Sequence, residues 1–306
     1  MTKKYYLSIA SIFKNESWGL KEWLEHYRFH GVDHVYLVND FSDDDYISIL
    51  KPFIEDGFVT LYQNDNPVRY TGRQIDINNK FFIPIIKESQ WVAQVDCDEY
   101  LFSPKTIDIK NILSKYERYS AVTANWVWFN GNGHIKQPSS IVKGFTKRCD
   151  YDATANIINP VGHPETTRFD APKVIINSDY DILSFDVHTV RIKSGGELIN
   201  ISHISNREDP ELLINHYQLQ SREYWENVKM YRGDMNHIFL GNPRNFELYD
   251  AMNLGDIEDT RLWDQNKSID SGYNGIIGMN NLGRNGRLGN QMFQYAALVG
   301  IAKQCG

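Results

Sequence analysis

The front third of the chain alternates between two kinds of hydrophobic pattern. Short apolar stretches with strand-like spacing, such as YYLSIASIF, are separated by longer stretches whose apolar residues recur at helical spacing. The pattern predicts strands over 5–13, 34–40, 58–63 and 91–95, with helices over 15–31, 43–57 and 73–89 between them. Pro84 is expected to kink or end the last of these helices. Strands and helices in alternation are typical of an α/β fold, in which a mostly parallel central sheet carries helices on both faces.

Beyond residue 103 this alternation weakens. Residues 119–130 predict one more strong strand, residues 173–193 predict several short strands, and residues 209–234 predict a helix, either continuous or broken. After Gly241 the chain is rich in Asn, Gly and Asp, so we expect weaker order there.

Composition narrows the class of protein. A hydrophobic content of 42% supports a sizeable core, and a net charge of -7 argues against a nucleic-acid partner. An aromatic content of 13% suits either a sugar-binding surface or an aromatic core. The apolar runs are shorter than the about 18–20 residues of a membrane helix, and the start lacks the pattern of a signal peptide. The three cysteines are odd in number and share no metal-ligand spacing, so a disulfide framework is not expected. We therefore expect a cytoplasmic protein in a reducing compartment.

Acidic residues gather where two of the predicted strands end. Asp96, Asp98 and Glu99 follow the fourth strand, and Asn39 and Asp40 close the second. Like charges this close are unfavourable unless a cation lies among them, and carboxylate oxygens are ligands suited to Mg²⁺ or Mn²⁺. Because ligands bind at the carboxyl ends of parallel strands, both groups are expected to face one crevice.

Four stretches of the sequence carry a more specific signal than composition does. They are KNESWGLKEWLEHYRFHGVDHVYLVNDFSDDD, WVAQVDCDEYLF, NWVWFNGNGH and INHYQLQSREYWENVKMYRG, in that order. Together they resemble the family 92 glycosyltransferases and the related family-2-like group, which have the GT-A fold, Rossmann-like with a mostly parallel sheet. That family carries Asp-Val-Asp-Glu-Phe where this chain has Asp-Cys-Asp-Glu-Tyr from Asp96 to Tyr100. The resemblance covers residues 1–240.

The resemblance implies an inverting glycosyltransferase that uses Mn²⁺ or Mg²⁺. It would transfer a sugar, often galactose in this family, from a UDP-sugar to an oligosaccharide or glycan acceptor. Asp96 and Asp98 would be the metal motif. The nucleotide pocket would be lined by Lys14, Asn15, Glu16, Asn39, Asp40, Arg73 and Asp96. Many relatives have Asp where this chain has Asn39, which leaves the nucleobase of the donor open.

Three further roles follow from the resemblance and from the chemistry. GT-A enzymes often add a late histidine to the metal, and His216 is preferred here, with His188 as the alternative. Inversion needs a carboxylate base near the acceptor hydroxyl, and either Glu165 or Asp186 could supply it. Trp126, Trp128 and Phe129 would form a sugar-stacking wall, or else belong to an ordinary core strand. The residues expected to bind substrate are Trp126, Phe129 and His134.

Two other classes of function fit part of the pattern. A metal-dependent nucleotidyltransferase also uses a parallel sheet and acidic ligands, but it usually carries a Gly-rich phosphate loop after the first strand, where this chain reads FKNES. A non-catalytic carbohydrate-binding module would account for the aromatic residues alone. It has no need of Asp-x-Asp at the end of a buried strand.

The end of the chain resembles a different family. GRLGNQMFQYAALVGIAKQCG, residues 286–306, is similar to the opening signature of family 11 fucosyltransferases, which have a GT-B fold. About 30 residues are too few to bury a core of that kind. We therefore expect a short C-terminal extension that begins a truncated second domain, and no fucose transfer from this chain. The predicted organisation is a GT-A domain over 1–245, a linker over 246–273 and the extension over 274–306.

Overall fold

The computed structural model describes residues 3–158, 164–193, 196–200, 209–233, 235 and 244–270. The chain divides into two compact units, Met1–Leu262 and Trp263–Gly306. The fold below is that of the first unit. The segment that resembles a fucosyltransferase, residues 274–306, lies outside the described residues.

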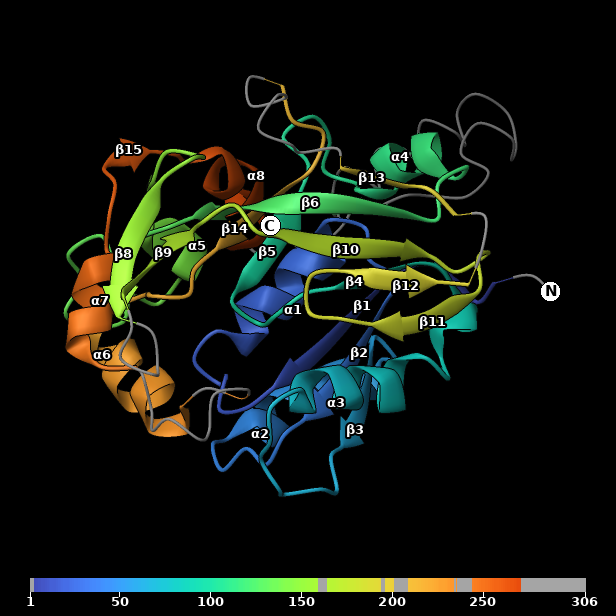
Figure 1. Ribbon diagram of the computed structural model, residues 1–306, viewed down its shortest axis with the longest axis horizontal. Helices are drawn as coiled ribbons and strands as arrows, with labels where there is room; N and C mark the ends of the chain where they lie inside the picture. Colours follow the sequence, from blue (N-terminus) through green and yellow to red (C-terminus); the bar gives the residue numbers. More distant parts are fainter. Residues whose placement is uncertain are drawn as a thin grey trace, which may run out of the picture. The chain divides into compact units, whose positions relative to one another are not determined.

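The described residues form a nine-stranded mixed sheet with the order β3-β2-β1-β4-β10-β6-β14-β5, and β13 pairs with β6 (Figure 1). Parallel pairing joins β1 to β2 and β4, β2 to β3, and β6 to β13 and β14. Only β10 and β5 run against their neighbours in this sheet. The strands of its first half are β1 (Tyr5–Phe13), β2 (His34–Asn39), β3 (Val59–Gln63) and β4 (Ser89–Gln94). The predicted α/β fold with a mostly parallel sheet is confirmed.

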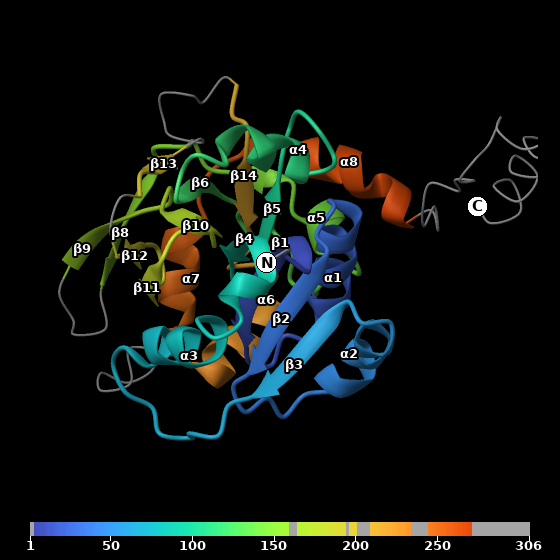
Figure 2. The same cartoon turned by 90° about the vertical axis from the view of Figure 1, so that its right-hand side faces the viewer.

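Helices cover both faces of the parallel strands. Figure 2 shows α1 (Leu20–Phe29) and α2 (Tyr46–Glu55) on one side of β1–β3 and α3 (Arg73–Phe82) on the other. Ile77 and Phe82 of α3 pack in one apolar cluster with Ile12 and Val38 of the strands. As expected from Pro84, α3 ends at Phe82, and a 3₁₀ turn, η1 (Ile86–Glu88), precedes β4.

The second half of the unit widens the sheet and adds three small two-stranded sheets. Its strands are β5 (Glu99–Phe102), β6 (Ala121–Trp128), β7 (Lys147–Arg148), β8 (Thr154–Ile158), β9 (Pro164–Arg168), β10 (Pro172–Asn177), β11 (Ile182–Phe185), β12 (Val190–Ile192), β13 (Leu198–Asn200), β14 (Leu213–His216) and β15 (Ile257–Glu258). Its helices are α4 (Lys110–Leu113), η2 (Ser114–Tyr116), α5 (Ile141–Gly144), α6 (Arg222–Tyr224), the π-helical turn η4 (Trp225–Met230), α7 (Phe246–Met252) and α8 (Arg261–Asp270), which begins at the end of the unit.

The predicted helix over 209–234 is wrong in its first part. Leu213–His216 forms β14, which inserts between β6 and β5 and is buried along its whole length. Tertiary pairing on both sides outweighs the helical spacing of the apolar residues. The helical part begins only at Arg222, where the Ser221 side chain caps α6.

Residues 246–262, which the sequence pattern assigns to a linker, carry α7 and β15 within the first unit. Trp128 Nε1 donates to the backbone oxygen of Met252 at 3.1 Å, and β15 pairs with β7. Arg148 Nε donates to Asp259 at 2.8 Å. Within the described residues, every helix is too short or too polar to cross a membrane.

Candidate functional site

A cavity of about 200 Å³ opens where the parallel strands end. Lys14 and Glu16 follow β1, Asp40 follows β2, and Asp96 and Asp98 follow β4. The other lining residues come from β1, α3, β6, β14, η4 and nearby loops: Ile12, Arg69, Gln74, Cys97, Trp126, His216, Gln218, Lys229, Arg232, Gly233, Met235 and Arg244. The two predicted acidic groups therefore face one cavity, as expected for carboxyl ends of parallel strands.

The three clustered carboxylates are balanced by two buried lysines. Asp96 accepts a hydrogen bond from Lys173 Nζ at 2.8 Å, and the same ammonium lies 3.4 Å from Glu99 Oε1. Asp98 pairs with Lys229, which is likewise buried. These two ion pairs are what allows like charges to gather at the end of an interior strand.

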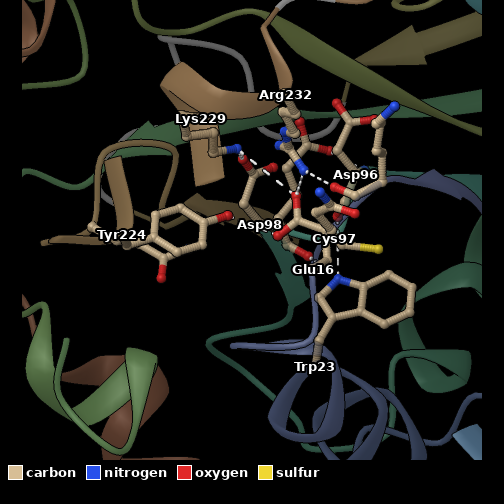
Figure 3. A network of polar contacts seen from close by, with 12 residues as sticks. Glu16, Trp23, Asp96, Cys97, Asp98, Tyr224, Lys229 and Arg232 are labelled. Carbon is tan, nitrogen blue, oxygen red and sulfur yellow. Dashed lines mark hydrogen bonds and ion pairs between the residues drawn. The ribbon is translucent and has the colours of Figure 1, made fainter. Parts of the chain in front are cut away.

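α1 holds the backbone of this acidic turn in place. Trp23 Nε1 donates to the backbone oxygens of Asp96, at 3.1 Å, and Glu99, at 2.9 Å (Figure 3). The Tyr27 hydroxyl donates to the same Glu99 oxygen at 2.9 Å. Both aromatic side chains are fully buried, so the turn is positioned by the core of the protein.

His216 lies beside the carboxylates. Its Nε2 is 3.7 Å from Asp98 Oδ1 and 4.0 Å from Glu99 Oε1, and its ring contacts Trp126 with a centroid distance of 4.3 Å. His188 touches the same Trp126 ring, at 5.1 Å, but its Nδ1 is hydrogen-bonded to the backbone oxygen of Pro172 at 2.9 Å. Of the two candidate histidines, the structure brings His216 to the acidic cluster.

Ligand atoms of Asp98, Glu99 and His216 all lie within 4.8 Å of one another. His216 Nδ1 is buried and has no hydrogen-bond partner among the described residues. Carboxylate oxygens with one imidazole form a donor set that suits Mn²⁺ or Mg²⁺. These side chains therefore fit a divalent cation.

Burial and charge set the protonation of these groups. Burial alone would raise the pKa of Asp98, but the Lys229 ammonium and His216 hold it well below its usual range. Burial raises the pKa of Glu99 well above its usual range, although Lys173 opposes the rise. Burial also lowers the pKa of His216. A charged Asp98 and a neutral His216 are the forms that bind metal.

Basic side chains surround the acids. Lys14, Arg69, Lys229, Arg232 and Arg244 line the same cavity, although the whole chain carries a net charge of -7. Positive charge concentrated at one hollow of an acidic protein favours an anionic ligand there.

Figure 3 shows how Arg232 is held. Its guanidinium contacts the Glu16 carboxylate and donates to the backbone oxygen of Lys14 at 2.5 Å. The Tyr224 hydroxyl donates to Glu16 at 2.7 Å. The late segment of the chain is thereby tied to the end of β1.

Of the protein residues predicted to line the nucleotide pocket, Asp40 lies in the cavity wall, whereas Arg73 and Asn39 make other contacts. Asp40 lines the cavity, and Asn64 Nδ2 donates to it at 2.8 Å. Arg73 is buried and pairs with Asp40, and it is not among the described residues that line the cavity. Asn39 donates to Gln63 Oε1 at 2.7 Å, toward β3. Arg73 thus positions Asp40 in this structure.

Asn15 lies in the loop after β1 with a left-handed backbone, φ 54°. Its Nδ2 donates to Asp43 Oδ1 at 2.6 Å, and the Asp43 amide donates back to Asn15 Oδ1 at 2.9 Å. These two bonds join the loops that follow β1 and β2. Asn15 therefore helps to fix the loop that carries Lys14 and Glu16.

Of the residues expected to bind substrate, Trp126 lines the cavity. Phe129 and His134 are not among its described lining residues. Phe129 packs on the Tyr217 ring at 4.8 Å, and His134 Nε2 lies 2.9 Å from the backbone oxygen of Gly144.

The two candidate bases are both exposed, and neither is among the described residues that line the cavity. Glu165 lies on β9 in the β8–β9 hairpin. Asp186 lies in the turn between β11 and β12. The Gln94 amide, oriented to satisfy its neighbours, donates to the backbone oxygens of Asp186 and Val187 at 3.1 Å each. That bond links the β11–β12 turn to the end of β4.

Sequence reasoning missed the basic partners Lys173, Lys229 and Arg232. Lys173 had a usable signal, because a single charge within the apolar stretch PKVIIN predicts a buried counter-charge. Lys229 and Arg232 stand three residues apart in a helical segment, and nothing in their spacing marks the cavity.

Comparison with known proteins gives two glycosyltransferases as relatives of this chain. A glycosyltransferase family 92 protein of Oryza sativa subsp. japonica is 23% identical over 236 residues, which cover 74% of this chain and 35% of that protein. The galactan beta-1,4-galactosyltransferase GALS3 of Arabidopsis thaliana is 31% identical over 131 residues, 40% of this chain and 26% of that protein. The chain thus matches about a third or less of the length of these curated relatives.

Matches among solved structures include S. aureus TarS 1–349 in complex with UDP-GlcNAc, with a TM-score of 0.41 and 11% identity over 98% of this chain and 81% of that one. HddC from Yersinia pseudotuberculosis has a TM-score of 0.33 and 14% identity over 65% of this chain and 92% of that one. The model of the family described as Glycosyltransferase family 92 matches residues 3–262. Since that match covers most of the sequence, the chain belongs to glycosyltransferase family 92.

Proposed function

We propose that this chain transfers galactose from UDP-galactose to a carbohydrate acceptor, with inversion and with the help of Mn²⁺ or Mg²⁺. The observation that carries the proposal is the meeting of Asp96, Asp98 and His216 with a ring of basic side chains in one cavity. Membership of family 92 supports the reaction class. The Arabidopsis relative, named as a galactosyltransferase, supports galactose.

Asp98 and His216 would hold the ion, with Asp96 beside them. A divalent ion there would neutralise negative charge on the departing diphosphate. Lys14, Arg69 and Arg232 would bind the phosphate oxygens. Asp40, held by Arg73, would receive the nucleoside.

For the base we propose Asp186. Gln94, two residues before Asp96, anchors the β11–β12 turn, and His188 of that turn contacts Trp126 on the cavity wall. Glu165 lies in a hairpin whose first strand packs on α7. In the transfer step the acceptor oxygen bonds to the anomeric carbon, the bond from that carbon to the diphosphate breaks, and the hydroxyl proton passes to Asp186.

The test measures release of UDP by the 306-residue chain from a panel of nucleotide-sugars, with galacto-oligosaccharides as acceptors. We expect release that requires an acceptor, prefers UDP-galactose and stops when a chelator removes the metal. Preference for a GDP-sugar would contradict the donor. Full activity in the chelator would contradict the metal requirement while leaving the transferase intact.

A further inference from the structure

Lys229 occupies the acidic side of the cavity. Its Nζ contacts Asp98 Oδ2 and lies 4.0 Å from Glu16 Oε1, and its side chain is 2% exposed. The ammonium also lies 5.7 Å from the centre of the Tyr224 ring (Figure 3). A single positive charge therefore stands against the carboxylate that best fits a metal ligand.

The other lysine of the cluster has a different support. Lys173 belongs to β10, which pairs with β4 on one side and β6 on the other, so its backbone is fixed within the sheet. Lys229 belongs to a six-residue π-helical turn, a type of turn that is frequent at functional sites. The two cations thus differ in their freedom to move.

The residues after Lys229 reach the strand-end loops through polar contacts. The Tyr231 hydroxyl donates to Asp43 at 2.9 Å, Arg69 donates to the backbone oxygen of Arg232 at 3.1 Å, and Arg232 contacts Glu16. Hydrogen bonds and ion pairs of this kind can be exchanged for contacts with a charged ligand at small cost. The segment is therefore suited to rearrange when an anion enters the cavity.

Asp98 cannot serve two cations equally. Its Oδ1 faces His216 at 3.7 Å, while its Oδ2 is taken by Lys229. A divalent ion at Asp98 and His216 would repel an ammonium left on the same carboxylate. An incoming diphosphate would attract that ammonium instead.

We propose that Lys229 is an internal competitor for the metal position on Asp98, and that it transfers to the diphosphate when the donor binds. This inference rests on the proposed metal-dependent use of a nucleotide-sugar. The exchange makes the ion and the nucleotide bind cooperatively. The ion displaces the Lys229 ammonium from Asp98 and frees it for the diphosphate, and the diphosphate draws the same ammonium away from the metal position. Lys229 is then a positioning residue for the metal and a binding residue for the donor.

The test is titration of Mn²⁺ into the protein, followed by electron paramagnetic resonance of the free ion, with and without UDP. In Lys229→Met we expect Mn²⁺ alone to bind at least about 10-fold more tightly than in the wild type, because the competitor is gone. The factor by which UDP tightens Mn²⁺ binding should fall toward one. Lys136→Met is the matched control, since Lys136 forms an exposed ion pair with Glu223 at 2.6 Å, and it should behave as the wild type.

Equal or weaker Mn²⁺ binding by a folded Lys229→Met variant would overturn the inference. A crystal structure of the wild type with Mn²⁺ and UDP gives a second test that needs no variant: Lys229 Nζ must leave Asp98 and meet a diphosphate oxygen, and an unchanged Lys229–Asp98 pair would overturn it. Absence of any Mn²⁺ binding would also overturn it, while galactose transfer in a chelator would show that the transferase activity stands without the metal.

Discussion

Lys173 of β10 forms an ion pair with Asp96, a partly exposed residue of the loop that follows the neighbouring strand β4. The ammonium, which is fully buried, donates to Asp96 Oδ2 at 2.8 Å and lies 3.4 Å from Glu99 Oε1. A charge on a core strand costs desolvation, and it is tolerated because two carboxylates face it. The acidic turn from Asp96 to Glu99 is thus built around a cation supplied by the protein itself.

Lys173→Met should destabilise the fold. It keeps the length of the side chain but leaves Asp96 and Glu99 without their partner, and breaking a buried pair costs about 3–5 kcal/mol. Urea unfolding monitored by circular dichroism measures the change in free energy. The exposed pair of Lys105 and Asp209, at 2.8 Å, provides the control variant Lys105→Met, for which we expect a change below about 1 kcal/mol. An equally small change for Lys173→Met would contradict this account.

Asp98→Asn should reduce UDP release by about 100-fold or more, because it removes a charged ligand from the group that stabilises the departing diphosphate. The amide is isosteric, and Lys229 still has Glu16 at 4.0 Å, so the fold should persist. Initial rates in saturating Mn²⁺ and a thermal unfolding scan measure both effects. Asp209→Asn changes an exposed carboxylate and serves as the control. A near-wild-type rate for Asp98→Asn would remove this residue from the proposed site.

Much of the fold and part of the site could be predicted because local pattern decides them. Each of Glu16, Asp40 and Asp98 follows the end of a parallel strand, and such ends meet at one edge of the sheet. The partners of those acids could not be found this way. Lys229 is 131 residues from Asp98, and Lys173 is 77 from Asp96, so only tertiary structure brings them together.

Periodicity also explains why part of the expected sugar-stacking wall is elsewhere. Side chains alternate across a strand, so Phe129, three positions after Trp126, is directed to the opposite side from it. Phe129 packs there against Tyr217, while Trp126 lines the cavity.

His216 was predicted within a helix, yet it ends β14, since the short apolar run LINH does not distinguish a buried strand from a helix.

Acid should weaken the attachment of β15 through Asp259. Burial would raise the pKa of Asp259, but hydrogen bonds and charge from Arg261 and Arg148 outweigh burial and lower it below its usual 3.8. A carboxylate with a lowered folded pKa contributes stability above its unfolded pKa, and that stability is lost as the pH falls through the folded value. The free-energy difference between wild type and Asp259→Asn should therefore be constant above about pH 5 and shrink below pH 3.8.

Urea unfolding at a series of pH values measures that difference. Asp250→Asn is the control, because Asp250 forms a partly exposed ion pair with Arg222 at 2.7 Å and should give a small difference at every pH. A difference for Asp259→Asn that stayed constant down to pH 3 would contradict the lowered pKa.

Matched amide substitutions at Asp186 and Glu165 test which of the two carboxylates is the catalytic base. Asp186→Asn should lower kcat by about 100-fold while leaving the KM for the donor nearly unchanged, since a general base contributes about 10²–10⁴ to the rate and does not bind the nucleotide. Glu165→Gln should leave both constants near the wild-type values, because Glu165 lies in the β8–β9 hairpin, whose first strand packs on α7. Hydrolysis of UDP-galactose without acceptor, together with transfer, separates loss of the base from loss of donor binding. If Glu165→Gln lost transfer and Asp186→Asn kept it, the base would be Glu165, and the hairpin would have to approach the cavity when acceptor binds.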